Sequence, residues 1–189
     1  TALRLDSENS MALDIRNPDT GAVIPGGYGI AKRSTGLQAS LLNATLTSVA
    51  GNAIEVAGVG KNTDNGDYSR ITLSNSNVTA ASGQRVLDVG SQTISFFNNN
   101  TNQNETTTFT TDGFSFVTHN TTLTGDIAIG DHSQNINLLL DQGTQLSGNI
   151  NIDAVNNLML TANHAVLNGN ITVGSGSSNI TLSFNEETQ

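Results

Sequence analysis

The feature that most limits the fold of this chain is a repeat with a period of about 22 residues in its last third. A Leu-x-Gly-Asp/Asn-Ile motif occurs three times, and its leucines Leu123, Leu146 and Leu167 are separated by nearly one period each. A second motif, Asn-x-x-Leu, keeps step with the first and begins at Asn135, Asn157 and Asn179. A repeat of this length indicates stacked units, each too small to bury its apolar face alone.

Within each unit, apolar and polar residues alternate, which is the period of a β-strand and not of a helix. Short strands joined by Gly, Asn, Ser and Asp turns predict an all-β chain folded as a single-stranded parallel β-helix, a solenoid with about 22 residues per rung. Equal spacing should stack equivalent side chains in columns that point inward. We expect three such columns: Ile127, Ile150 and Ile171; Leu123, Leu146 and Leu167; and Ile136, Leu158 and Ile180.

We expect residues 1–189 to form one β-helical domain, a fragment of a longer protein, with two loop insertions. The stretch from Asn43 to Gly58 resembles the stretch from Asn75 to Gly90, and the offset between them exceeds one rung by about ten residues. The extra residues fall in 59–70, which lacks apolar alternation and is rich in turn formers. The polar tract at 98–108 is the second predicted insertion. Both should protrude, because neither has an apolar face to bury.

Five of the six phenylalanines fall between positions 96 and 116, around the second insertion. One interpretation is a hairpin-like excursion whose aromatic side chains fill a wider part of the core. The alternative is an exposed aromatic platform for a glycan. Short alternating runs usually bury one face, which favours the first interpretation.

Charge is distributed unevenly along the chain, which has a net charge of −9. All seven cations lie before residue 86, where seven acids balance them, and residues 86–189 carry nine acids and no cation. An acidic surface repels phosphates and anionic membranes, so we expect neither a nucleic acid partner nor direct insertion into a membrane. No apolar run of about 18 residues is present.

Chemical motifs are scarce. The recurring asparagines are interpreted as a structural column of stacked amides. The segment 62–67 resembles a calcium loop only loosely, because the bidentate Glu is missing. The three histidines lack partners for zinc, and cysteine is absent. We find no catalytic constellation, so we expect no catalytic residues, no metal, no cofactor and no enzyme.

The repeats resemble the rungs of bacterial autotransporter passenger domains, of the pertactin-like, self-associating adhesin type. The resemblance is carried by Thr122–Ile127, by Gly143–Ile150 and by the Tyr28-Gly-Ile-Ala segment. It implies a right-handed parallel β-helix that a C-terminal β-barrel translocator exports and displays on the bacterial cell surface, or that is secreted. It also implies a role in adhesion, aggregation and biofilm formation.

Three functions remain open: an adhesin that binds a host surface protein, a glycan or another copy of itself; a non-binding stalk; and a polysaccharide-active enzyme. The repeat pattern is interrupted near 59–70 and 98–108. These interruptions favour the adhesin, because the repeats of a stalk should be uniform. Self-association could align two chains antiparallel, so that cations of one meet acids of the other. The candidate binding residues are Lys32, Arg33, Lys61, Asp64, Asp67, Arg70, Arg85, Asp126, Asp131, Asp141 and Asp153.

Overall fold

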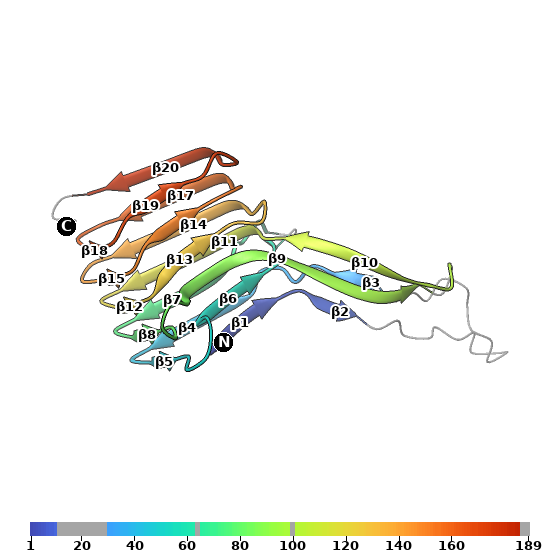
Figure 1. Ribbon diagram of the computed structural model, residues 1–189, viewed down its shortest axis with the longest axis horizontal. Helices are drawn as coiled ribbons and strands as arrows, with labels where there is room; N and C mark the ends of the chain where they lie inside the picture. The colour runs from blue at the N-terminus through green and yellow to red at the C-terminus, as the bar shows by residue number, and fades with distance from the viewer. Residues whose placement is uncertain (11–29, 63–64, 99–100, 186–189) are drawn as a thin grey trace.

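The computed structural model describes residues 1–10, 30–62, 65–98 and 101–185, and every regular element among them is a β-strand (Figure 1). The strands are β1 (Leu3–Asp6), β2 (Glu8–Ser10), β3 (Ile30–Lys32), β4 (Gln38–Leu42), β5 (Thr45–Thr47), β6 (Ile54–Ala57), β7 (Ser69–Ser74), β8 (Asn77–Thr79), β9 (Arg85–Asn98), β10 (Gln103–Thr110), β11 (Asp112–His119), β12 (Thr122–Thr124), β13 (Asp126–Ile129), β14 (Gln134–Asp141), β15 (Gln145–Ser147), β16 (Ile150–Ile152), β17 (Asn156–Ala162), β18 (Val166–Asn168), β19 (Ile171–Val173) and β20 (Ser178–Phe184). No helix capable of crossing a membrane occurs in the described part of the chain.

The strands stack into three parallel sheets, and each complete rung contributes one strand to each sheet (Figure 1). Sheet 1 has the order β1-β6-β9-β13-β16-β19, sheet 2 the order β4-β7-β11-β14-β17-β20, and sheet 3 the order β5-β8-β12-β15-β18. Successive rungs are hydrogen-bonded in register, so the fold is the predicted parallel β-helix. Each rung has three strands, because the Leu-x-Gly-Asp/Asn-Ile motif spans a turn and supplies a strand on either side of it.

The three predicted inward columns are confirmed. Ile127 pairs with Ile150 and Ile150 with Ile171 in sheet 1, and the corresponding leucines pair in sheet 3. The third column, Ile136, Leu158 and Ile180, pairs in the same way in sheet 2. In all three columns the first two side chains are buried and the third is half-buried, since the last described rung is covered from one side only. Removal of these apolar side chains from water is the main stabilising force of the coil.

The recurring asparagines of sheet 2 form the predicted amide contact between two of the three rungs. Asn157 Nδ2 donates to Asn135 Oδ1 at 2.7 Å, whereas Asn179 Nδ2 donates to Asn156 Oδ1 at 3.0 Å. All three also have left-handed backbones, with φ of 55°, 59° and 54° at positions 135, 157 and 179. Asparagine tolerates this conformation better than other non-glycine residues do, which is a second reason for its recurrence.

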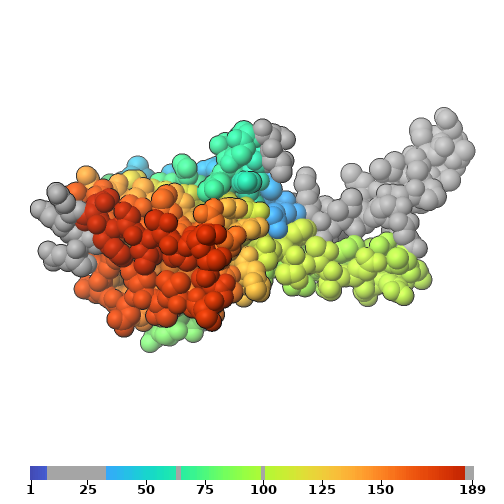
Figure 2. Space-filling view, turned by 90° about the horizontal axis from the view of Figure 1, so that it is seen from above, coloured from blue at the N-terminus to red at the C-terminus, as the bar shows by residue number. Residues whose placement is uncertain are grey.

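One long hairpin leaves the solenoid. The first half of β9 lies between β6 and β13 in sheet 1, and its second half pairs antiparallel with β10. The space-filling view from above shows this hairpin extending beyond the coil (Figure 2). We call the paired segments Ser91–Asn98 and Gln103–Thr110 the arm. A second antiparallel pair, β2–β3, projects on the same side (Figure 1).

The arm accounts for the second predicted insertion, since the 98–108 segment is mostly a paired strand and not an irregular loop. The predicted hairpin is confirmed, but only Phe114 and Phe116 of the aromatic cluster fill the core. Phe96 and Phe109 are half-buried on the arm, and Phe97 is 47% exposed there. In the 59–70 segment, Val59, Gly60 and Ser69 are buried, and Ser69 and Arg70 belong to β7, so these residues are part of the coil and not of a projecting loop.

Candidate functional site

An open groove lies on the outer face of sheet 1, where the arm leaves the coil. Its cavity volume is about 440 Å³, and a smaller recess of about 210 Å³ continues it toward the first rungs. Arg85, Asp88, Ser91 and Asp131 line both spaces, so we treat the two as one groove. The floor is formed by outward residues of β9, β13 and β16, and Thr108 and Thr110 of the arm form one wall.

The floor begins with a charged column that runs across three strands. In register, Arg4 of β1 faces Glu55 of β6, which faces Asp88 of β9. Arg4 Nη1 donates to Glu55 Oε2 at 2.9 Å, and Arg4 Nε donates to Asp6 Oδ2 at 2.7 Å. Arg85 Nη1 donates to Asp88 Oδ1 at 2.6 Å. Both guanidinium groups of the groove are therefore neutralised within the chain.

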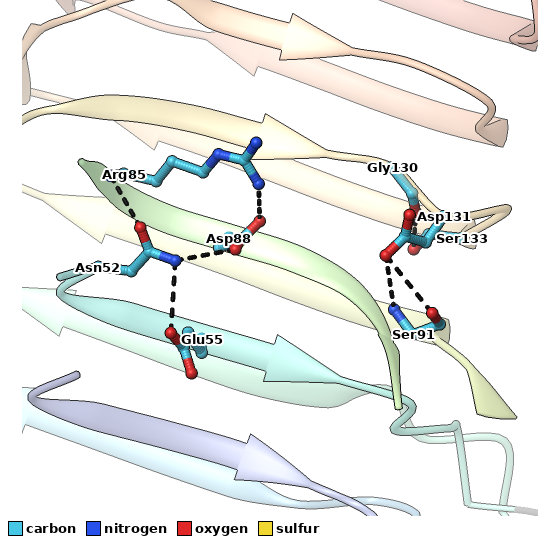
Figure 3. Close-up of polar contacts among 8 residues, drawn as sticks. All are labelled: Asn52, Glu55, Arg85, Asp88, Ser91, Gly130, Asp131 and Ser133. Carbon is cyan, nitrogen blue, oxygen red and sulfur yellow. Dashed lines mark hydrogen bonds and ion pairs between the residues drawn. The ribbon is translucent and has the colours of Figure 1, made fainter. Parts of the chain in front are cut away.

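Asn52 holds these charged groups together (Figure 3). Its Oδ1 accepts the backbone N–H of Arg85 at 3.0 Å, and its Nδ2 donates to Asp88 Oδ2 at 2.9 Å and to Glu55 Oε1 at 3.3 Å. One amide thus joins a backbone and two carboxylates from two neighbouring rungs. The contacts fix the carboxylates in place and satisfy part of their hydrogen-bonding capacity.

The pKa of Glu55 reflects this network. Partial burial raises it, but hydrogen bonds from Thr1 and Asn52 and the positive charge of Arg4 outweigh the burial, so the pKa lies below its ordinary value. Opposite charge and hydrogen bonds to the ionised form both favour the carboxylate. Glu55 is therefore ionised at neutral pH.

Asp131 lies at the upper edge of the groove, in the turn after β13. Its Oδ2 lies 3.4 Å from both the backbone nitrogen and the hydroxyl oxygen of Ser91 (Figure 3). The turn is closed by Ser133 Oγ, which donates to the carbonyl oxygen of Gly130 at 2.6 Å. Gly90 leaves room for the carboxylate, because a Cβ there would lie 2.8 Å from Asp131 Oδ2.

The uncompensated charge of the groove is negative. Its lining includes Glu55, Asp88, Asp131 and Asp153, against the two paired arginines Arg4 and Arg85. No ion pair within the described residues neutralises Asp131 or Asp153. The groove is suited to groups that donate hydrogen bonds, such as amides, hydroxyls or amines. No three acidic or histidine side chains in the described ranges are placed to hold a metal ion.

The base of the arm is fixed by a cluster of hydrogen bonds. The hydroxyl of Thr111, which is fully buried, donates to the carbonyl of Gly90 at 2.6 Å and accepts the N–H of Gly58 at 3.0 Å. Gln92 Oε1 accepts the N–H of Ser7 at 2.6 Å. Gly58 has a φ of +68°, and a Cβ there would lie 2.8 Å from the carbonyl oxygen of Phe109. Glycine at this position lets the arm pack against β6.

Arg33 contributes a further link to the base of the arm. Its guanidinium lies 5.6 Å from the centre of the Phe109 ring, and Nη1 lies 3.7 Å from Asp112 Oδ2. A cation over an aromatic ring is attracted by the ring quadrupole. The side chain therefore joins the segment after β3 to β10 and to the start of β11.

Comparison of the chain with protein families, with curated proteins and with solved structures found no match.

The structure brings three of the predicted binding residues, Arg85, Asp131 and Asp153, into the groove. Asp126 faces Arg85 across the β9–β13 pair, and its Oδ1 accepts the N–H of Asn149 at 2.7 Å, a bond between rungs. Arg33 belongs to the base of the arm, as described above.

The other predicted residues lie elsewhere. Asp67 and Arg70 line a separate recess at the edge of sheet 2, and the backbone N–H of nearby Lys61 bonds to Asp112. Asp141 ends β14, where it contacts His119 and Asn163. Lys32 ends β3, with its side chain outside the described part, and Asp64 lies outside the described residues.

Sequence reasoning missed Arg4, Asn52, Glu55, Asp88 and Ser91 as parts of the groove. It also overlooked that Asp131 and Asp153 are separated by the length of one rung, which could have been read from the sequence. The remaining residues lie in rungs of irregular length. Glu55 and Asp88, for example, face each other although the rung between them carries an insertion. Their alignment becomes visible only once the insertions are placed.

Proposed function

We propose that this chain is part of a bacterial cell-surface adhesin that binds through the groove and the arm. The observation that carries the proposal is the long hairpin of β9 and β10. It projects from the coil, is fixed at its base, and forms one wall of the groove. A projecting element on a rigid scaffold is the usual arrangement of binding surfaces. The resemblance of the repeats to autotransporter passengers supports display at the outer membrane by a C-terminal β-barrel.

Adhesion accounts for the groove better than catalysis does. A general acid needs a carboxyl group whose pKa is raised toward the working pH. The pKa of Glu55 is instead lowered, and Asp88 is bound to both Arg85 and Asn52. The bonds that hold these groups in place suit recognition of a partner. We infer that the chain is not an enzyme.

A non-binding stalk is the second candidate, and the regular rungs after the arm favour it. From β11 to β20 the coil has no projecting hairpin, and equivalent residues pair rung after rung. Such a coil could act as a spacer. A stalk, however, would lose nothing if the arm were removed, so the two candidates are separable by experiment.

The test is to remove the arm without disturbing the coil. Gln92 and Phe109 face each other at the base of the hairpin, so an Asn-Gly turn can replace residues 93–108 and leave the contacts of Gln92 with Ser7 and of Phe109 with Arg33 in place. The parent chain and the armless chain would be displayed on non-aggregating bacteria and compared for clumping and for adhesion to host cells. Circular dichroism and thermal melting of the purified chains would confirm that the coil remains folded.

We expect the armless chain to lose adhesion or clumping while its coil stays folded. A matched control carries Asn65→Ser and Asp67→Ser, which change an exposed turn over sheet 2 and leave the arm intact. Equal binding by the parent and the armless chain would reject the proposal and favour the stalk. Loss of binding by the control as well would place the binding surface elsewhere.

A further inference from the structure

The arm, which extends beyond the coil, carries on β10 a strand edge that no other described strand covers. β10 spans eight residues and pairs along one edge with β9 only, so its other edge has no partner among the described strands. Proteins usually protect such an edge with lysine, proline or a bulge. β10 has the sequence QNETTTFT, which contains neither Lys nor Pro and has Glu105 as its one charge. Threonine and phenylalanine favour strand pairing.

The contact between Thr93 and Thr108 shows which backbone groups point to this edge. Their hydroxyl oxygens lie 2.8 Å apart, and side chains approach most closely in a non-hydrogen-bonded antiparallel pair. We therefore assign Thr93 and Thr108 to such a pair, in which the N–H and C=O of Thr108 point away from β9. Because this orientation alternates along a strand, Thr106 also offers both groups to a new strand, and Thr107 turns its own toward β9.

Charge identifies the kind of partner. Two copies with a net charge of −9 repel each other when their coils approach. Residues 91–110 carry only one charge, Glu105. At about 3.4 Å per residue, the six residues that separate the base of the arm at Thr110 from Asn104 near its tip span about 20 Å, which is more than twice the Debye length of about 8 Å at physiological salt. Contact through the arms therefore keeps the acidic coils far enough apart for salt to screen their repulsion.

We propose that β10 pairs antiparallel with β10 of a second copy, about a two-fold axis at Thr107. This inference rests on the proposed adhesive function and names its partner. The two arms form a continuous four-stranded sheet in which Thr106 faces Thr108 of the other copy. Glu105 faces Phe109, and the two Glu105 side chains are about 13 Å apart along the strands, so they do not oppose each other. A two-fold contact of this kind closes on itself.

The same register brings the tip of one arm to the groove of the other copy. Asn104 faces Thr110 of the second copy and lies on the sheet face that carries Thr106 and Thr108, because side chains alternate. Thr108 and Thr110 form the wall of the groove beside Asp131 and Asp153. The amide of Asn104 can therefore donate to the uncompensated carboxylates. Strand pairing supplies the affinity, and the amide contact fixes the register.

A single cysteine tests the axis directly, since the chain has no cysteine of its own. Thr107→Cys places two sulfur atoms in a non-hydrogen-bonded pair across the axis, where side chains are closest. Mild oxidation should link the two copies into a covalent dimer. The matched control is Thr93→Cys, an exposed position on β9 separated from its symmetry mate by both copies of β10. This control should stay monomeric on non-reducing gels.

Sedimentation of the purified chain over a range of concentrations supplies the second test. We expect a concentration-dependent dimer in the parent. Thr106→Pro removes an outward N–H, and Thr107→Lys places like charges opposite each other, so each should weaken association at least tenfold. Thr93→Lys adds the same charge on β9 and should change association less than twofold. Raising the salt should leave the parent dimer equally strong or stronger.

The outcomes separate this inference from the proposed function. A parent that stays monomeric, or a Thr107→Cys chain that links no faster than Thr93→Cys, would overturn the pairing of two β10 strands. If the β10 strands did not pair but the armless chain lost adhesion to host cells, the adhesive function would stand and its partner would be a different molecule. A dimer that survives removal of the arm would overturn the inference and place self-association on another face.

Discussion

Ile150 offers the most direct test of the packed columns, because its neighbours in the column are isoleucines on both sides. It is 1% exposed, with Ile127 in the rung below and Ile171 in the rung above. Ile150→Ala leaves a gap that cannot close, since backbone hydrogen bonds hold the adjacent strands about 4.8 Å apart. Truncation of a buried isoleucine costs about 2–5 kcal/mol, so we expect about 3 kcal/mol here. Ile171→Ala should cost less than half of that, because Ile171 is only half-buried.

The assay is urea and thermal unfolding of purified chains, with Asn151→Ala as the control. Asn151 is the next residue and lies exposed on the opposite face of the same strand, so its truncation should stay within about 0.5 kcal/mol. For a chain of this size, about 3 kcal/mol corresponds to a fall in melting temperature of roughly 6–12 °C. Ile150→Asp should destabilise more, because it buries an unpaired carboxylate. Equal midpoints for Ile150→Ala and Asn151→Ala would refute the column.

Two further predictions concern turns and pH. Asn157→Ala should destabilise the fold by about 1–2 kcal/mol, because alanine disfavours the left-handed backbone and cannot donate a hydrogen bond to Asn135. Asn157→Gly should recover most of this loss, because glycine adopts the left-handed conformation readily. Equal melting temperatures for the two variants would contradict this reasoning. The pKa of Asp141 is lowered by the backbone N–H of Gln142 and further by Asn163 and His119, against a smaller opposing effect of burial. Its stabilisation is therefore complete above the unfolded pKa of about 3.9 and is lost as the pH falls through the lower folded value. The stability difference between the parent and Asp141→Asn, measured by urea unfolding from pH 7 to pH 2, should shrink as the pH falls below about 4; a difference that does not change down to pH 2 would contradict this assignment.

The coil could be predicted from the sequence because its two determining signals are local. Alternation fixes which face of a strand points inward, and the regular spacing of the repeat fixes which side chains stack. These two signals were sufficient to predict the column of Ile127, Ile150 and Ile171. The number of strands in a rung was harder to predict, because a turn inside the Leu-x-Gly-Asp/Asn-Ile motif divides what looks like one strand into β12 and β13. The glycine of that motif marks the division only in retrospect.

The groove could not be predicted because it depends on alignment between rungs of unequal length. Arg4 faces Glu55, and Glu55 faces Asp88, across two separations that differ from each other and from the regular period of the last third. No local pattern gives these offsets. The arm was partly visible as a polar and aromatic interruption, but its length and its free edge depend on where β9 leaves the coil. Burial of Thr111 and the close contact at Gly58 fix that point, and both involve residues distant in the sequence.

The structure also bears on the alternative in which whole coils associate antiparallel through opposite charges. Two of the five cations invoked for that arrangement are already paired within the chain, Arg33 with Asp112 and Arg85 with Asp88. An exposed ion pair contributes at most about 1 kcal/mol, and a cation with an internal partner contributes less to a new one. Arg33 is also a poor position for a charge reversal, because it stacks on Phe109 at the base of the arm.

Lys61 and Arg70 form the better pair for testing that arrangement, since neither has an ion pair among the described residues and both are exposed. We expect the double variant Lys61→Glu, Arg70→Glu to associate as the parent does within about twofold at both low and high salt. If charge pairing held the copies together, reversal would weaken association at low salt, and added salt would weaken the parent as well. Pairing through β10 predicts the opposite salt dependence, because salt screens the repulsion between acidic coils and leaves backbone hydrogen bonds intact. Sedimentation of the parent at two salt concentrations therefore decides between the two arrangements, and association that falls with salt would count against the arm.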